Sequence, residues 1–142
     1  MLRILACCLL IWSICAWPTH AQSCSDLQGI WENELGSRLV IAQVTTDHQL
    51  QGEYRSSSGV DGQTFPLIGW VNNRGPDAKG PVTISFSVRW EGYGSLTSWT
   101  GTCETDEDGA SIKTLWHLVR PGPEFAWERI IANSSTFRPV QE

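Results

Sequence analysis

The alternation of apolar and polar residues in PVTISFSVRW (81–90) constrains the fold more strongly than any other feature of this sequence. One face of this stretch carries Val82, Ile84, Phe86, Val88 and Trp90. A period of two is typical of a β-strand that is buried on one side. LQGEYRS (50–56) and SIKTLWHLV (111–119) show a similar period, and no segment shows the 3.6-residue period of a helix. The sequence therefore predicts an all-β protein.

Turn signals rich in Gly, Asn, Asp and Ser separate the apolar runs at fairly even spacing. They predict eight strands, near residues 27–33, 37–44, 49–56, 64–71, 81–90, 97–104, 110–119 and 124–137. Eight short consecutive strands with hairpin-length turns favour an eight-stranded antiparallel up-and-down β-barrel, with a Greek-key sandwich as the alternative. A closed barrel leaves no exposed edge strand, and its interior is about wide enough for one small ligand.

The first 21 residues are typical of a secretory signal peptide. Arg3 is followed by an apolar run from Ile4 to Trp17, and the segment ends on the small residue Ala21. The run is short for a membrane span, so an uncleaved anchor is the weaker alternative. We expect a signal peptide at 1–21, a β-barrel domain at 22–142, and a secreted, extracellular protein.

Cleavage after Ala21 would leave two of the five cysteines, Cys24 and Cys103. Two cysteines in a secreted domain predict one disulfide. It would tie the start of the chain to a late strand and so close a long loop. A metal site is the alternative, but two cysteines without a nearby histidine pair supply too few ligands for zinc. No metal is therefore expected.

The charge and the histidines argue against several functions. Without Arg3, nine Lys and Arg stand against fifteen Asp and Glu, a net charge of −6. Nucleic acids and anionic membranes are therefore not expected as partners. His48 and His117 have no nucleophile and orienting acid at a readable spacing, so the protein is not expected to be an enzyme. TDEDG (105–109) lacks the remaining ligands of a calcium loop and is interpreted as a solvated hairpin tip.

Several polar and aromatic residues fall on the predicted inward faces, close to the strand ends. They are Trp31, Asn33, Ser37, Tyr54, Ser56, Thr97, Trp99 and Trp116. A core packed only for stability would prefer Leu, Ile and Val. Indole rings with a few convergent polar groups are more typical of a small-molecule pocket.

Six motifs resemble, in order and spacing, those of the avidins and streptavidins, which are secreted biotin-binding proteins. They are GIWENELGS (29–37), GEYRS (52–56), PLIG (66–69), FSVRW (86–90), TSWTGTC (97–103) and KTLW (113–116). The resemblance covers Cys24 to about Arg138, and Cys24 and Cys103 match the disulfide found in avidin but not in streptavidin. It implies high-affinity binding of biotin, without a cofactor, to sequester the vitamin. The alternative is a secreted barrel that carries another small ligand.

The resemblance also implies a role for each polar residue at a matched position. Asn33, Ser37 and Tyr54 would donate hydrogen bonds to the ureido oxygen of biotin. Ser56 would accept a hydrogen bond from one ureido N–H, and Thr97 would lie near the thioether sulfur. Three donors held in place before binding would favour a carbonyl acceptor strongly.

Aromatic and loop residues complete the site that the resemblance implies. The aromatic box around the bicyclic ring would be Trp90, Trp99 and Trp116. The start of the loop over the valeryl chain would be Ser57, Ser58 and Gly59. The contacts to the carboxylate would be Tyr93 and Ser95.

The last predicted strand departs from the family's pattern. The family has Asn or Asp facing the second ureido N–H, and ungapped counting from Trp127 puts Ser135 there. Asn133 could take its place if a bulge shifted the strand. We expect an affinity below that of the tightest members. Asn133 also begins a glycosylation pattern with Ser134 and Ser135, which we interpret as incidental because Asn133 would face the barrel interior.

This chain matches the family at fewer positions of the predicted subunit contact than of the predicted pocket. Trp127 matches a tryptophan that one subunit places in its neighbour's pocket, which implies a homotetramer, with a dimer as the alternative. Family members add a small contact of apolar residues on the last strand, where this chain has Ala132 and Ser134. Leu115 still fits that contact.

Overall fold

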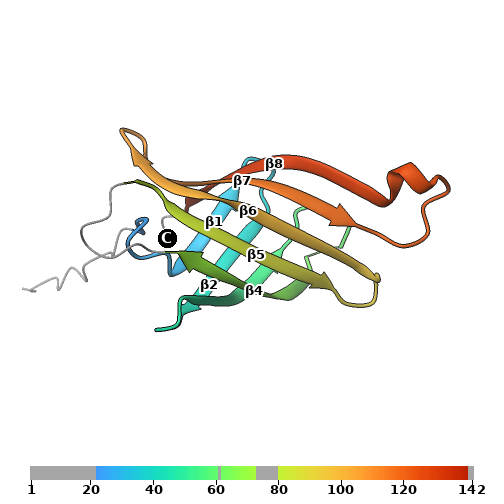
Figure 1. Cartoon of the computed structure of the whole chain (residues 1–142), viewed down its shortest axis with the longest axis horizontal. Coiled ribbons are helices and arrows are strands. Elements are labelled where there is room, and N and C mark those ends of the chain that lie inside the picture. Colours follow the sequence, from blue (N-terminus) through green and yellow to red (C-terminus); the bar gives the residue numbers. More distant parts are fainter. Residues whose placement is uncertain (1–21, 61, 73–79, 141–142) are drawn as a thin grey trace, which may run out of the picture.

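A computed structural model describes residues 22–60, 62–72 and 80–140, and the predicted signal peptide at 1–21 lies outside them. The strands are β1 (Gly29–Asn33), β2 (Arg38–Val44), β3 (Gln49–Arg55), β4 (Thr64–Asn72), β5 (Val82–Trp90), β6 (Ser95–Asp106), β7 (Gly109–Val119) and β8 (Ile130–Pro139). They form a closed barrel in sequence order, each antiparallel to its neighbours (Figure 1). The predicted eight-stranded up-and-down barrel is confirmed, and the sandwich is excluded.

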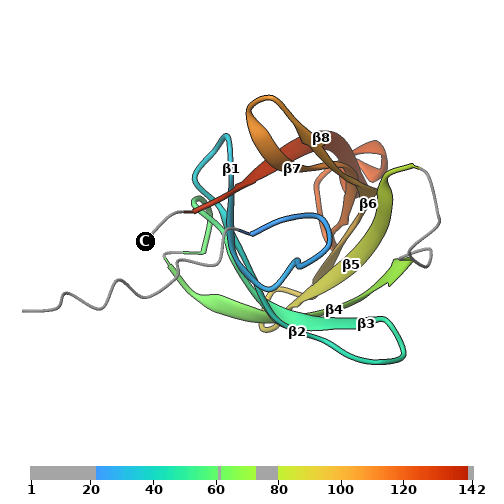
Figure 2. The ribbon, with the colours of Figure 1, turned by 90° about the vertical axis from the view of Figure 1, so that its left-hand side faces the viewer.

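The barrel closes where β1 pairs with β8. Trp31 lies opposite Pro139, and Asn33 lies opposite Phe137. Figure 2 shows the resulting ring of strands almost end-on. Because the strands run alternately up and down, the connections after β1, β3, β5 and β7 all meet at one end. We call this end the mouth.

Apolar side chains on the inward faces of the strands form the core of the barrel. Those with no exposed surface include Trp31, Leu39, Leu50, Val88, Ile112 and Phe137. Trp31 donates its indole N–H to the Leu27 carbonyl oxygen at 2.9 Å, so it belongs to this core rather than to a pocket. Phe86 stacks on Trp99 across β5 and β6, with ring centroids 4.9 Å apart.

The start of the last strand differs from the prediction. The range 124–137 was expected to be extended, but β8 begins at Ile130, after a 3-10 helix, η1 (Ala126–Arg129). The backbone N–H of Arg120 donates to the Arg129 carbonyl oxygen at 3.0 Å, so residues 121–128 form a loop that this bond closes rather than part of the strand. The connection therefore turns, and η1 extends beyond the barrel at the mouth end (Figure 1).

The predicted disulfide joins Cys24 to Cys103, 79 residues later in the chain. It links the segment before β1 to the part of β6 farthest from the mouth. The prediction is confirmed, and the alternative of a metal held by these cysteines is wrong because both sulfurs are bonded to each other.

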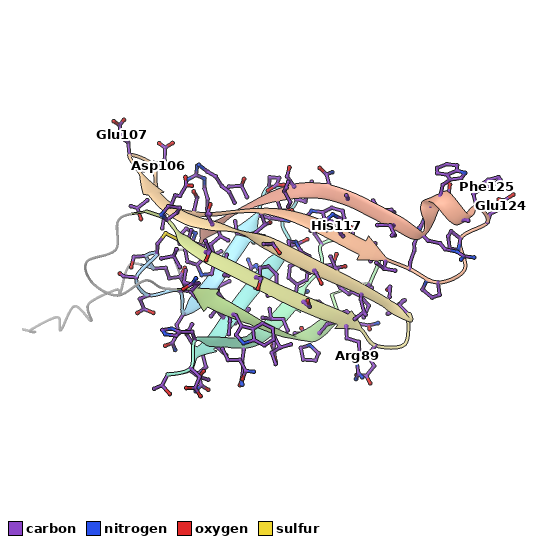
Figure 3. All side chains as sticks on the ribbon, viewed as in Figure 1. Arg89, Asp106, Glu107, His117, Glu124 and Phe125 are labelled. Carbon is purple, nitrogen blue, oxygen red and sulfur yellow. A yellow bond between two sulfur atoms is a disulfide. The ribbon has the colours of Figure 1, made fainter. Side chains whose placement is uncertain are left out.

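The acidic stretch after β6 is a tight hairpin. β6 ends at Asp106 and β7 begins at Gly109, and the two residues pair directly. Asp106 and Glu107 project from the end of the molecule opposite Glu124 and Phe125 (Figure 3). Within the described ranges, no three or more His, Cys, Asp or Glu side chains cluster as metal ligands. In the same ranges, no helix is long and apolar enough to cross a membrane.

Candidate ligand-binding site

A cavity of about 340 Å³ opens at the mouth, which is within the usual size of a small-molecule site. It is lined by thirteen of the predicted site residues: Asn33, Ser37, Tyr54, Ser56, Ser58, Gly59, Trp90, Tyr93, Ser95, Thr97, Trp99, Trp116 and Ser135. They come from six strands and the connections between them. Ser57, Asn133 and Trp127 do not line the cavity of their own chain.

The amide of Asn33 is held in one orientation at the inner end of the cavity. Its Oδ1 accepts the backbone N–H groups of Leu35 at 3.1 Å and Ser37 at 2.8 Å. Its Nδ2 therefore faces the barrel interior, where it donates to Ser135 Oγ at 3.4 Å. The turn after β1 thus fixes a donor, and one Nδ2 hydrogen is left for a ligand.

Ser37 and Tyr54 supply two further hydroxyl groups beside Asn33. Ser37 Oγ accepts the backbone N–H of Ser57 at 3.1 Å, so Ser57 positions this hydroxyl from outside the cavity. Tyr54 is only 5% exposed, and this burial raises the pKa of its phenol. A hydrogen bond with Ser37 lowers that pKa and the charge of Glu34 raises it, both by less than burial does. Tyr54 is therefore a protonated donor at neutral pH.

We predict that Tyr54 keeps its proton to a higher pH in the folded protein than in the unfolded chain. Since its pKa is raised above 10.0, the folded state binds more protons just above pH 10. The contribution of Tyr54 to stability is thus fully present below pH 10 and is lost as pH rises through the folded pKa. Tyrosinate absorbance in Tyr93→Phe, where Tyr54 is the only tyrosine, measures this shift. Equal midpoints in native and denatured protein would contradict it.

Three indoles form the walls of the cavity. Trp99 lies against Tyr54 with ring centroids 4.9 Å apart, and Trp90 packs edge-on against Tyr54 at 5.8 Å. Trp90 Nε1 donates to Thr97 Oγ1 at 2.7 Å, which fixes that wall and leaves the Thr97 hydroxyl hydrogen available. Trp116 Nε1 donates to Ser135 Oγ at 3.2 Å. Two of the three walls, Trp90 and Trp116, are thus tied by hydrogen bonds as well as by packing, whereas the buried Trp99 Nε1 has no partner among the described residues.

The connection after β3 borders the open side of the cavity. Ser56 Oγ donates to the Ser58 carbonyl oxygen at 2.8 Å and accepts the Ser58 backbone N–H at 3.3 Å. One lone pair of Ser56 remains for a ligand N–H. On the other side of the mouth, Tyr93 is 46% exposed and its hydroxyl accepts Gln63 Nε2 at 3.4 Å.

The register of β8 distinguishes between Ser135 and Asn133. β7 and β8 pair without a shift from Ile112–Phe137 to Val119–Ile130, so the bulge that Asn133 would need is absent. Ser135 is 5% exposed and lines the cavity, whereas Asn133 is exposed and its Oδ1 accepts the Ser134 backbone N–H. The expectation that burial keeps a glycan off Asn133 is therefore wrong, because this side chain is exposed. Whether the glycosylation pattern is used or incidental stays untested.

Comparison with known proteins assigns this barrel and its cavity to a family. The model of the Avidin family matches residues 21–140. The chain belongs to the avidin family. Avidin from Gallus gallus is 32% identical to it over 114 residues, which cover 78% of this chain and 73% of avidin. Afifavidin from Afifella pfennigii is 27% identical across 99% of this chain and 93% of its own length.

Solved structures of avidin-like proteins share the fold. Xenavidin superposes with a TM-score of 0.70 at 30% sequence identity, and the match covers 83% of this chain and all of xenavidin. A structure described as a biotin binding protein from chicken gives a TM-score of 0.71 at 26% identity, covering 84% of this chain and 100% of that one.

Three further residues of this avidin-family cavity were not predicted: Leu35, Val60 and Leu118. Leu118 shares a face with Trp116 at a period of two, so the alternation of β7 could have identified it. Leu35 and Val60 lie in connections, where no periodic pattern indicates which side chains turn inward.

Trp127 lies on the outside of its own barrel. It belongs to η1, is 76% exposed and stacks on Phe125, with ring centroids 5.7 Å apart. An indole so exposed is unusual for a solvated turn and is typical of a surface that contacts a partner.

Proposed function

We propose that this member of the avidin family binds biotin, without catalysis, in the mouth of its barrel. The observation that carries the proposal is the convergence of Asn33, Ser37 and Tyr54 at the inner end of an aromatic cavity. A ureido oxygen is a strong acceptor that three donors can surround. Because the protein fixes these donors before binding, little conformational entropy is lost when the ligand enters.

The other lining residues suit the remainder of biotin. The flat bicyclic ring would lie among Trp90, Trp99 and Trp116, which bury its apolar surface. Thr97 would lie near the thioether sulfur, and Ser56 has a lone pair for one ureido N–H. The valeryl chain would run past Ser58 and Gly59, and its carboxylate would lie at the rim beside Tyr93 and Ser95.

The family supports this proposal without deciding the ligand. Members of the avidin family are binding proteins that act without a cofactor. One similar solved structure is described as a biotin binding protein, but it is only 26% identical to this chain. Biotin itself is therefore proposed on the chemistry of the cavity, since fold alone does not identify a ligand.

Titration of the purified protein with biotin tests the proposal. We expect one site per chain by calorimetry, together with a change in tryptophan fluorescence as the ligand displaces water from the indole walls. Trp116→Ala should weaken binding, because it removes one wall and the N–H bonded to Ser135. Trp70→Phe is the matched control, since Trp70 is 57% exposed on the outer face of β4. Absence of heat and of fluorescence change with micromolar protein would contradict biotin binding.

We further propose that the chain forms a homotetramer in which Trp127 reaches the pocket of a neighbouring subunit. Apolar side chains line up on the outer face of the sheet at the mouth end: Leu96 pairs with Val119, and Val119 with Ile130. Each is between 47% and 62% exposed, which is typical of a surface that a second copy covers. Membership of the avidin family supports the same arrangement.

Light scattering on the size-exclusion peak tests the assembly, with four times the chain mass as the expected result. Trp127→Ala should lower biotin affinity about 30-fold, the effect of losing a buried aromatic contact residue. Glu124→Ala, on the same projecting connection (Figure 3), should leave affinity unchanged. A dimer that binds biotin equally well with and without Trp127 would contradict the proposed role.

We propose, finally, that the protein is secreted and sequesters biotin outside the cell. The disulfide supports an oxidising compartment. The amino terminus of the secreted protein, expected at Gln22, can be read by mass spectrometry.

A further inference from the structure

The hydroxyl of Ser135 lies at the inner end of the cavity and is already engaged by two donors. Trp116 Nε1 donates to Ser135 Oγ at 3.2 Å, and Asn33 Nδ2 donates to the same atom at 3.4 Å. Ser135 is 5% exposed, so water does not compete freely for this oxygen. A buried hydroxyl between two N–H groups has little freedom to change its partners.

Counting the lone pairs of Ser135 shows whether it offers a ligand a hydrogen-bond donor or an acceptor. A serine hydroxyl has two lone pairs and one hydrogen. Both lone pairs accept from Trp116 and Asn33, and among the hydrogen bonds of the described residues the hydroxyl hydrogen has no acceptor. The group left for a ligand is therefore the O–H donor.

Neither Trp116 nor Asn33 can change from donating a hydrogen bond to Ser135 to accepting one from it. The indole N–H of Trp116 is a donor only. The amide of Asn33 cannot turn over, because its Oδ1 accepts two backbone N–H groups. The Asn or Asp that the family resemblance leads one to expect at this position would keep an oxygen lone pair for the ligand. Ser135 does not.

We propose that Ser135 is a specificity-determining residue that selects a ligand with a hydrogen-bond acceptor at the ring atom facing it. The inference rests on the proposed function, because it assumes that a biotin-like bicycle occupies the cavity with its carbonyl at Asn33, Ser37 and Tyr54. The ureido N–H of biotin would face the Ser135 O–H. Because both groups are donors, no hydrogen bond could form between them. A cyclic carbamate, with oxygen replacing that one N–H, would accept the Ser135 hydrogen bond.

Binding of biotin then requires Ser135 to release one of its two donors. Either the indole N–H of Trp116 or the Nδ2 hydrogen of Asn33 loses its partner inside a closed cavity. An unpaired buried polar group of this kind reduces affinity about ten- to 100-fold. The carbamate avoids that loss, so this chain should bind it at least as tightly as biotin.

Calorimetry with both ligands tests this inference through the ratio of their dissociation constants, carbamate over biotin. For the unaltered protein we expect a ratio of one or below. Ser135→Asn should raise the ratio about ten- to 100-fold, because the side-chain oxygen can accept the ureido N–H. Ser135→Ala removes the hydroxyl but leaves two donors, Trp116 Nε1 and Asn33 Nδ2, facing the ligand, so it should keep the ratio at one or below. Ser98→Asn, at an exposed position on the outer face of β6, is the matched control and should leave the ratio unchanged.

A purely structural role for Ser135 would weaken both ligands equally and leave the ratio constant. A ratio of ten or more in the unaltered protein that Ser135→Asn does not raise overturns the inference but leaves biotin binding intact. If neither ligand binds the unaltered protein, the proposed function fails and the inference fails with it.

Discussion

Asn33→Asp should lower biotin affinity at least about 100-fold while the barrel remains folded. The carboxylate can still accept the backbone N–H groups of Leu35 and Ser37, so the turn after β1 keeps its shape. The Nδ2 donor, however, becomes an oxygen that faces the ligand carbonyl, acceptor to acceptor. The loss is about 3 kcal/mol of binding free energy, and each 1.4 kcal/mol corresponds to a factor of ten.

This substitution separates the two functions of Asn33, because it removes donation to the ligand and retains acceptance from the turn. Calorimetry measures the affinity, and thermal unfolding without ligand measures the fold. Asn72→Asp is the matched control, since it adds the same negative charge at an exposed position on β4. Biotin affinity within a factor of about three of the unaltered protein would refute the assignment of Asn33 as a ligand donor.

Replacing Cys24 and Cys103 by serine should destabilise the protein by about 4 kcal/mol. The disulfide closes a loop of 79 residues, and without it the unfolded chain gains the conformations that this closure excluded. For a domain of this size the midpoint of thermal unfolding should fall by about 10–20 °C.

The disulfide lies at the end of β6 remote from the cavity, so the same double variant should bind biotin with nearly unchanged affinity at a temperature where it is folded. Adding a reductant should lower the unfolding midpoint of the unaltered protein and have no such effect on the variant. If the variant loses less than about 1 kcal/mol, the bond does not restrain the unfolded chain as the loop length predicts.

The alternation of residues was sufficient to predict the barrel and the cavity residues that lie on its strand faces, whereas the residues in the connections and Ser135 were implied by the family resemblance. In β5 and β6 each residue is directed inward or outward by its position in a period of two. Phe86, Val88, Thr97 and Trp99 are therefore buried as the pattern predicts. This works because the two faces of a strand are defined locally, by the backbone itself.

The prediction was less accurate where the backbone leaves the strand pattern. The start of β8 was misplaced because η1 has too few residues to show a helical period. Ser57 was expected to touch the ligand, but it lies outside the cavity and holds Ser37 instead. In connections, hydrogen bonds rather than periodicity decide where a side chain points.

The sequence by itself determined the strand count, the inward faces and most of the polar and aromatic residues that line the cavity. Only the tertiary structure decided which of these residues form hydrogen bonds with each other. Asn33 and Ser135 are 102 residues apart, and they meet because β1 and β8 close the barrel. The choice between Ser135 and Asn133 likewise depended on the unshifted register of β7 and β8. The face of the strand on which a side chain lies follows from a local period of two. Its hydrogen-bond partners follow from long-range strand pairing, which no short stretch of sequence specifies.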